Sequence, residues 1–294
     1  MIAVRRAVAI VNPAAGSGGG AAIMFRLGEE LRRARLSAEL VLTPGPGEAA
    51  RLARAASEDG ADVVIAVGGD GTANEVANGI VGSATTLALY PLGSGNDFAR
   101  ALGYPRRRRD LARFIATARA RRIDVGEVNG RVFVNVAGVG IDGHVAERIR
   151  ASSRIVGRRL GYLAGSLVSI ATYRPRPMRI SIDGEVVEGR HLVVVVSNGT
   201  HFGGGMLPAP HAILDDGWLD VTRAGDIGRL ASVLALARLY RGTHLDGRTI
   251  VGARARVVEI ELERPEPMEL DGEPLRADHL SIRVRPGALS VLGR

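Results

Sequence analysis

Cysteine and lysine are both absent from this sequence. Without cysteine the chain has no disulfide, no thiolate metal site and no cysteine nucleophile. Without lysine it has no Walker A lysine, no protein-kinase strand lysine and no Schiff-base lysine. Any phosphate that this chain handles must therefore be bound by arginine side chains, by backbone N–H groups or through a metal ion.

Aromatic residues and long apolar runs are also scarce. Only 4% of the residues are aromatic, so stacking of single-stranded nucleic acid is poorly supported and no nucleic-acid partner is expected. No stretch approaches the roughly 20 apolar residues that span a bilayer, and the apolar run Ala7–Val11 is too short for a signal peptide. These features predict a cytoplasmic protein, with peripheral association at the inner membrane face as a further expectation.

Positive charge is the feature that the chain has in excess. The formal net charge is +8, and all 39 basic residues are arginine. An excess of this size indicates an anionic partner, for which a nucleotide, an acidic lipid surface and nucleic acid are the candidates. The arginines are spread along the chain, which leaves nucleic acid as the weakest of the three.

Strand-like and helix-like segments alternate in the first part of the chain. The expected strands are Ala7–Val11, Ala38–Leu42, Val63–Val67 and Thr86–Tyr90, and the expected helices are Ala21–Arg35, Glu48–Glu58, Ala73–Ile80, Asn96–Leu102 and Arg109–Ala120. Such alternation predicts an α/β domain with a parallel sheet covered by helices. We assign residues 1–125 to it as a nucleotide-binding domain.

From about Val125 the pattern becomes β-rich. Asn129-Gly130, Asp183-Gly184 and Asp271-Gly272 are typical hairpin turns. Further strands are expected at Val193–Val196, Leu219–Thr222, Val257–Leu262 and Leu280–Val284, with helices over about 156–173 and 227–240. The pattern predicts a mainly antiparallel β-sandwich over residues 126–285 as the acceptor-binding domain, and the tail 286–294 is expected to return to the first domain.

Three glycine-rich turns each follow a strand of the first domain: Asn12–Gly20, Gly68–Thr72 and Pro91–Asp97. Ligands of an open parallel sheet bind outside the carboxyl ends of the strands, where such turns lie. Glycine permits close backbone approach, and the helix that follows offers unpaired N–H groups to an anion. Asp70 lies among these groups and would repel a phosphate unless Mg²⁺ lies between them. The loops therefore favour phosphate binding with Mg²⁺.

These loops allow two other interpretations. A glycine-rich turn followed by Thr72 or Ser94 is often only a turn with a helix cap, although three such turns together favour a ligand. Gly16, Gly18 and Gly20 do not form the G-x-G-x-x-G pattern of dinucleotide-binding folds, which disfavours a nicotinamide dehydrogenase.

The same residues resemble the catalytic domain of the diacylglycerol kinase family, which includes bacterial lipid kinases and sphingosine kinases. The motifs follow the family's order along nearly the whole chain. They are Asn12-Pro13 with Gly16, Gly68-Gly69-Asp70-Gly71-Thr72 with Asn74-Glu75, Pro91-Leu92-Gly93-Ser94-Gly95-Asn96-Asp97-Phe98-Ala99-Arg100, Gly138-Val139-Gly140-Ile141-Asp142, Leu214-Asp215-Asp216-Gly217, and Asp271-Gly272-Glu273. NAD kinases and phosphofructokinase-like proteins share the Gly68–Thr72 loop, so the other motifs carry the resemblance.

The resemblance implies a nucleotide domain packed on a β-sandwich, with ATP and acceptor meeting in a cleft. The nucleotide-binding residues that it implies are Asn12, Pro13, Ala14, Ala15, Gly16, Thr43, Gly68, Gly69, Asp70, Gly71, Thr72, Asn74 and Ser94. It makes Glu273 the base for the acceptor hydroxyl and lets Asp70 act through Mg²⁺, with Asp97 and Asp124 in the surrounding carboxylate–water network. Arg100 is the best placed arginine for a phosphate clamp, and an ordinary surface charge is the equal alternative.

A second metal site follows from the same resemblance. Bacterial members hold a structural Mg²⁺ in the sandwich, at a loop similar to residues 212–218. Asp216 would supply its carboxylate, and Ile213 and Trp218 would supply backbone carbonyls. The chain departs from many bacterial members at Ser94, where they have threonine, and at Gly18, where a basic residue is common.

The function implied is an ATP- and Mg²⁺-dependent lipid kinase whose acceptor is diacylglycerol or a related lipid at the membrane surface. A kinase of NAD or of a soluble polyol remains an alternative, as does a non-catalytic lipid- or nucleotide-binding protein. The arginines over residues 148–159 precede apolar residues up to Ile170, so this stretch predicts either membrane contact or a helix that covers the sandwich. A homodimer is left open.

Overall fold

The computed structural model describes residues 6–15, 19–93, 95–152 and 158–294. The chain forms two compact units: Met1–Ile123 with Gly287–Arg294, and Asp124–Pro286. Two strands, β5 (Arg119–Val128) and β13 (Glu273–Gly293), each run from one unit into the other. No helix of the described residues is long and apolar enough to cross a membrane.

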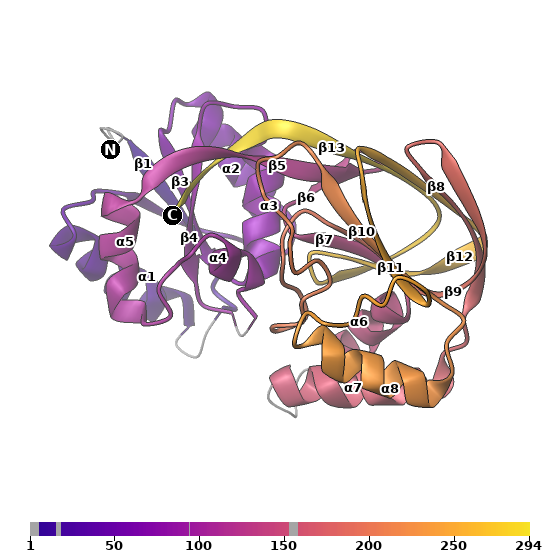
Figure 1. Cartoon of the computed structure of the whole chain (residues 1–294). Helices are drawn as coiled ribbons and strands as arrows, with labels where there is room; N and C mark the ends of the chain where they lie inside the picture. Colours follow the sequence, from indigo (N-terminus) through magenta and orange to yellow (C-terminus); the bar gives the residue numbers. More distant parts are fainter. Residues whose placement is uncertain (1–5, 16–18, 94, 153–157) are drawn as a thin grey trace. The chain divides into compact units, whose positions relative to one another are not determined.

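The first unit is an α/β domain, as predicted (Figure 1). Its elements are β1 (Ala7–Val11), α1 (Gly19–Arg33), β2 (Glu39–Leu42), α2 (Glu48–Glu58), β3 (Val63–Gly68), α3 (Asp70–Ile80), β4 (Thr86–Pro91), α4 (Asp97–Ala101), the 3₁₀ turn η1 (Arg108–Asp110) and α5 (Leu111–Thr117). Every residue of β1 and β3 is buried, as expected for central strands covered on both faces.

The strands of this unit pair in parallel in the order β4-β3-β1-β2, and the last residues of β13 add a parallel partner beside β4. The connection from β1 through α1 to β2 moves toward one end of the strand order, and those through α2 to β3 and through α3 to β4 move toward the other end. Because such crossovers are right-handed, α1 lies on one face of the sheet and α2 and α3 lie on the other. Accordingly α2 packs on α3 and α1 packs on α5. The loops after β1, β3 and β4 therefore leave the same edge of the sheet.

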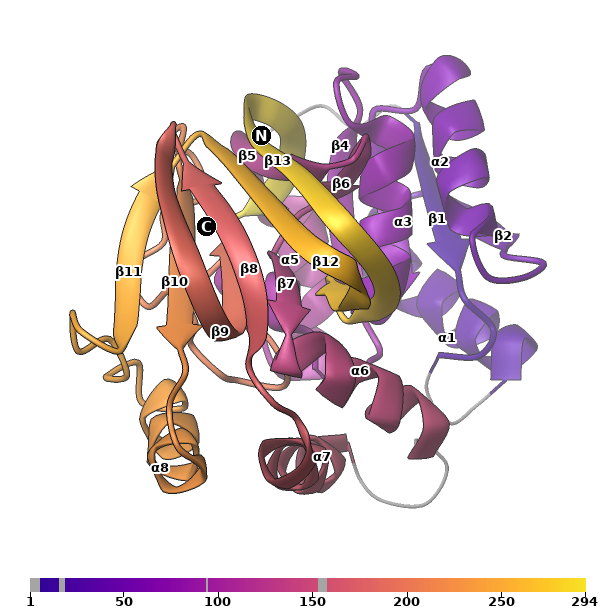
Figure 2. The same cartoon turned by 90° about the vertical axis from the view of Figure 1, so that its right-hand side faces the viewer.

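The second unit is a mainly antiparallel sandwich, and its described residues also form three helices (Figure 2). Its further elements are β6 (Arg131–Phe133), β7 (Val136–Gly140), α6 (Ile141–Ser152), α7 (Arg158–Thr172), β8 (Arg176–Ile182), β9 (Glu185–Ser197), β10 (Leu219–Gly225), α8 (Arg229–Leu239), β11 (Ile250–Ala255) and β12 (Val257–Leu270). The strands follow the order β11-β10-β9-β7-β12-β13, and β8 pairs with both β9 and β12. Its core consists mainly of aliphatic side chains, such as Val194 on β9, Ile260 on β12 and Ile282 on β13.

One expectation about secondary structure was wrong, and one helix was missed. The helix expected over Arg109–Ala120 ends at Thr117, because Ala118 is extended and the arginine-rich stretch that follows is strand β5. Helix α6 was not expected at all. It contains Gly143, which lowers helix propensity, but a Cβ there would overlap the carbonyl of Pro267, so the glycine lets α6 pack against β12.

Candidate active site

The predicted nucleotide residues of the first unit begin at the end of strand β1. The Asn12 backbone N–H donates to the Val67 carbonyl at 3.0 Å. Its side-chain Nδ2 donates to Thr72 Oγ1 at 3.1 Å, and its Oδ1 accepts from the Ala14 N–H at 2.9 Å. Asn12 therefore joins the first loop to helix α3. Pro13 and Ala14 are exposed.

Glycines bring the second and third loops into contact. A Cβ at Gly93 would lie only 2.7 Å from the Gly69 Cα, and a Cβ at Gly68 would overlap the Thr72 side chain. The Leu92 N–H donates to the Gly68 carbonyl at 2.7 Å. A side chain at Gly93 would therefore force the two loops apart, whereas one at Gly68 would displace Thr72 at the start of α3.

Two carboxylates converge beside the third loop. Asp70 is the first residue of α3, and its Oδ2 accepts from the Asn96 N–H at 2.9 Å. A Cβ at Gly95 would lie 2.8 Å from Asp70 Oδ2 and 3.6 Å from Asp97 Oδ2. Hard carboxylate oxygens at a strand edge are the donors that Mg²⁺ uses together with phosphates, so the residues present fit a phosphate-bound Mg²⁺.

The Arg100 side chain forms hydrogen bonds within the third loop. Its guanidinium donates to Asp97 Oδ1 at 2.7 Å and to the Gly95 carbonyl at 3.2 Å. Asp97 is buried, and the Arg100 side chain is 26% exposed. This arrangement gives Arg100 a definite place in the third loop, and its action as a phosphate clamp stays a prediction.

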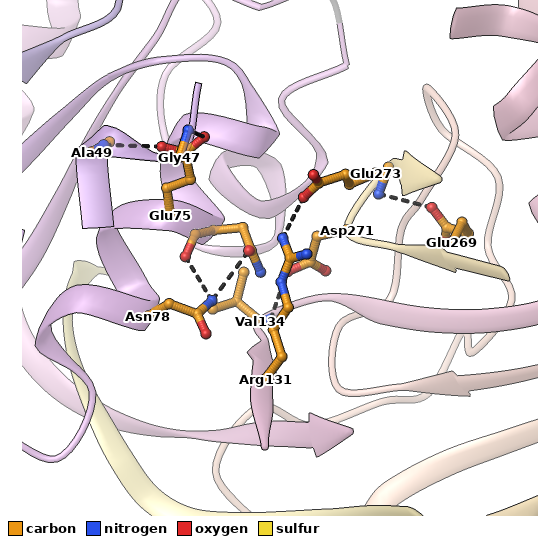
Figure 3. Close-up of polar contacts among 11 residues, drawn as sticks. Gly47, Ala49, Glu75, Asn78, Arg131, Val134, Glu269, Asp271 and Glu273 are labelled. Carbon is orange, nitrogen blue, oxygen red and sulfur yellow. Dashed lines mark hydrogen bonds and ion pairs between the residues drawn. The ribbon is translucent and has the colours of Figure 1, made fainter. Parts of the chain in front are cut away.

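Glu75 has a structural task that the sequence did not indicate. Its carboxylate accepts the N–H groups of Gly47 and Ala49, both at 3.0 Å, at the start of α2, which has no side-chain cap of its own (Figure 3). The loop between β2 and α2 contains Thr43, which is buried and whose N–H donates to the Val11 carbonyl. Glu75 therefore holds the loop that carries Thr43 against α3.

The remaining nucleotide residues are placed as follows. Asn74 is buried and its side-chain oxygen accepts from Asn78 at 3.1 Å. Gly71 is exposed with open space around it. Gly16 and Ser94 lie outside the residues that the structure describes.

The two Asp-Gly-Glu tripeptides of the second unit both form two-residue hairpin turns. Asp183 and Asp271 have φ values of 46° and 48°, each followed by a glycine with positive φ, as type I′ turns require. They differ in their surroundings. Asp271 is buried, and its carboxylate accepts the N–H groups of Val134, Asn135 and Val136 at 2.8–2.9 Å. Asp183 is exposed, and its carboxylate accepts the N–H groups of Arg256 and Val257.

Glu273 follows the buried turn, and its carboxylate forms an ion pair with Arg131 (Figure 3). The Glu273 side chain is 45% exposed. An ion pair of this exposure is typically worth about 0–1 kcal/mol, so a ligand can displace the arginine at little cost. The equivalent residue of the other turn, Glu185, is an exposed strand residue. The two tripeptides have the same residues, but they differ in burial: the aspartate of the turn before Glu273 is buried and that of the turn before Glu185 is exposed.

Asp124 and the predicted structural metal residues lie close together in the second unit. Asp124 is buried, and its Oδ2 accepts from the Gly217 N–H at 2.6 Å. Asp216 forms an ion pair with Arg254 and also accepts from the Trp218 N–H at 3.1 Å, while Ile213 is exposed. Among the described residues no cluster of three or more histidine, aspartate or glutamate side chains could hold a metal. The structural metal site stays a prediction.

An apolar cavity within the second unit was not foreseen from the sequence. Its walls are mainly aliphatic side chains from α6, α7, α8 and the neighbouring strands, and include Ile170, Val195, Leu236 and Ile250. The polar side chains at its walls are few: Asp142, Ser166, Thr222, Ser232, His244 and Glu269. A cavity of this kind suits a ligand that is largely hydrocarbon with a few hydrogen-bonding groups.

One carboxyl group at the cavity wall, that of Asp142, has a raised pKa. Burial raises the pKa of Asp142 to about 7. One of its oxygens accepts from the Gly143 N–H at 2.7 Å, and Oδ2 has no hydrogen-bond partner among the described residues. A side chain at Gly138 would overlap this carboxyl. The Gly138–Asp142 motif was noted in the sequence, but nothing there indicated a role for the aspartate.

Comparison with known proteins gives two family models that match in sequence order. Residues 6–128 match the diacylglycerol kinase catalytic domain, and residues 135–293 match the YegS C-terminal NAD kinase beta sandwich-like domain. The first match contains the three glycine-rich loops, and the second contains the cavity and the buried hairpin turn.

Individual proteins and a crystal structure are similar over most of the chain. A diacylglycerol kinase of Bacillus subtilis (strain 168) is 30% identical over 92% of this chain and 90% of its own length. A protein of Pseudomonas aeruginosa PAO1 named "Probable lipid kinase YegS-like" is 36% identical over 83% of this chain and 81% of its own. A crystal structure of a diacylglycerol kinase from Bacillus anthracis str. Sterne superposes with a TM-score of 0.78 at 26% identity, covering 100% of this chain and 98% of that one.

Proposed function

Because the chain belongs to the diacylglycerol kinase family, we propose that it is a lipid kinase that transfers the γ-phosphate of ATP to a lipid hydroxyl with the help of Mg²⁺. Diacylglycerol or a related lipid is the proposed acceptor. The observation that carries the proposal is the aliphatic cavity of the second unit. NAD and soluble polyols are strongly hydrated, and such walls cannot replace their hydrogen bonds with water.

The first unit supplies the residues for the nucleotide. The glycine-rich loops follow β1, β3 and β4. The bond from Asn12 to Thr72 joins the first loop to α3, and the bond from the Leu92 N–H to the Gly68 carbonyl joins the third loop to the second. Bound at the phosphates, Mg²⁺ would neutralise negative charge that develops during transfer. Asp70 and Asp97 are the side chains that would hold it, and Arg100 fixes the orientation of the Asp97 carboxylate.

The second unit supplies the base. As the acceptor oxygen forms its bond to the γ-phosphorus, the bond between that phosphorus and ADP breaks and the hydroxyl proton passes to the Glu273 carboxylate. Asp271 acts as a positioning residue, because its three N–H contacts fix the turn from which Glu273 projects. A carboxylate base in this position contributes about 10²–10⁴-fold to the rate.

The cavity would take the hydrocarbon part of the acceptor. Two buried carboxyl groups, Asp142 and Glu269, lie among its apolar walls. Glu269 accepts from the Gly272 N–H at 2.8 Å and so connects the cavity wall to the turn that precedes Glu273 (Figure 3). Hydroxyl groups of a glycerolipid are suitable partners for such carboxyl groups, while its acyl chains match the aliphatic walls.

A cavity-filling variant tests the proposal. Ala235 lines the cavity from α8, so Ala235→Phe should exclude part of a long acyl chain. We expect kcat/KM for a long-chain diacylglycerol in detergent micelles to fall by about tenfold or more, since overpacking typically costs about 1–3 kcal/mol. A short-chain diacylglycerol should be phosphorylated at nearly the wild-type rate.

The matched control is Ala231→Phe, which adds the same side chain at an exposed position of the same helix. This variant should treat both acceptors as the wild type does. Equal losses for short and long chains in Ala235→Phe, or equal effects of the two variants, would remove the cavity from acceptor binding.

A further inference from the structure

Helices α7 and α8 of the second unit expose a set of apolar side chains to solvent. We call this set the α7–α8 face: Leu163, Leu167, Val168, Leu230, Val233 and Leu234. Leu230 is 76% exposed and Leu234 is 55% exposed. The two helices contact each other and lie side by side in both views (Figures 1 and 2). Large side chains grouped in this way are typical of a surface that binds a partner.

Helix α8 is apolar on both sides, which is unusual for a helix at a surface. Its inner side lines the cavity with Ala235, Leu236 and Leu239. Its outer side carries Leu230 and Leu234. Helix α7 shows the same division, since Ser166 and Ile170 line the cavity. The face and the cavity are therefore the two sides of one thin helical layer.

The charges around this face are mainly positive. Arg229 and Arg238 on α8, Arg241 after it and Arg174 after α7 are all exposed. Residues 227–245 contain no acidic residue, and neither do residues 158–182. The acidic residues that flank α8 are already engaged: Asp226 pairs with Arg190, and the Asp246 carboxylate accepts backbone N–H groups of its own loop.

We propose that the α7–α8 face is a docking surface for an anionic lipid bilayer, into which its leucines insert while the surrounding arginines contact the headgroups. Apolar insertion combined with basic residues is the combination that retains proteins at such surfaces. That the bilayer also supplies the acceptor rests on the proposed function, because only the helical layer separates the face from the cavity. The docking itself does not depend on catalysis.

The test measures vesicle binding by the full-length protein without ATP. Phosphatidylcholine vesicles with and without phosphatidylglycerol are sedimented with the wild type and with the double variant Leu230→Gln/Leu234→Gln. We expect the wild type to bind the anionic vesicles, more weakly as salt rises, and the double variant to bind them at least about tenfold more weakly. Arg238→Gln/Arg241→Gln should lower binding to the anionic vesicles by about fivefold or more and leave binding to phosphatidylcholine unchanged.

The control Val186→Gln/Val257→Gln changes two apolar residues of the same unit that are 46% and 45% exposed on β9 and β12, and it should bind like the wild type. The proposal is overturned if the wild type binds no vesicles, or if Leu230→Gln/Leu234→Gln and the control Val186→Gln/Val257→Gln bind the anionic vesicles equally. It is also overturned if Leu230→Gln/Leu234→Gln instead converts a dimer into monomers, which would make the face an interface between copies. Vesicle binding without lipid phosphorylation would contradict the proposed function and leave the docking surface standing.

Discussion

Asp70→Asn is expected to lower kcat by at least about 100-fold, an effect of the size seen when one electrostatic contact to a transition state is removed. An asparagine oxygen can still accept from the Asn96 N–H that Asp70 Oδ2 binds now, so the loop should keep its conformation. What is lost is the negative charge that, in the proposed site, would stabilise a phosphate-bound Mg²⁺ beside Asp97. The measurement is kcat at saturating ATP and Mg²⁺, with a thermal unfolding curve to show that the variant is folded.

Asp59→Asn is the matched control for this variant. Asp59 follows helix α2 in the same unit, and its side chain is 69% exposed. Asp59 precedes β3 and contacts Arg6 just before β1, so this substitution removes the same charge at the edge of the sheet opposite the glycine-rich loops and should leave kcat unchanged. Turnover at the wild-type rate by Asp70→Asn would exclude this carboxylate from the chemistry.

The second large effect is expected from Glu273→Gln. The amide keeps the size of the side chain but cannot accept the hydroxyl proton, so kcat should fall by about 100-fold or more while ATP binding changes little. ATP affinity should be measured separately by calorimetry, so that a loss of binding is not taken for a loss of chemistry.

Glu185→Gln is an unusually close control for this variant. Both glutamates follow an Asp-Gly turn of the same type and each pairs across its hairpin with the residue before the aspartate. Only the turn before Glu273 is buried and fixed by three backbone N–H groups, so Glu185→Gln should retain wild-type activity. If the Glu185 variant is the inactive one, the assignment of the base in the second unit is wrong.

Much of the fold could be predicted because its signals are local. The all-buried strands β1 and β3 are continuous apolar runs, and the three hairpins were predicted by their Asn-Gly and Asp-Gly pairs. Helix α6 could not be predicted, because the contact that explains its glycine is distant in sequence. Gly143 is unfavourable for a helix in isolation and is explained only by the Pro267 carbonyl, which lies more than a hundred residues later in the chain.

The candidate site also has a part that could be predicted from local sequence and a part that could not. The loops around Gly68, Asp70 and Gly93 could be identified because glycines and an acid after strands have a direct chemical meaning. The partners of these residues could not, since the Arg131–Glu273 pair and the contacts of Asp271 join segments far apart in sequence. The cavity is the clearest case, because Asp142 and Leu236 are ordinary residues until the fold places them at one apolar wall.

Lipid kinase activity is tested most directly by incubating the purified protein with γ-labelled ATP and Mg²⁺ and offering it three acceptors: long-chain diacylglycerol in micelles, NAD, and a total lipid extract. Label should appear in diacylglycerol or in another lipid of the extract. Omitting Mg²⁺ should abolish the transfer, and Glu273→Gln should slow it by about 100-fold or more. Labelled NAD with no labelled lipid would contradict the proposed function.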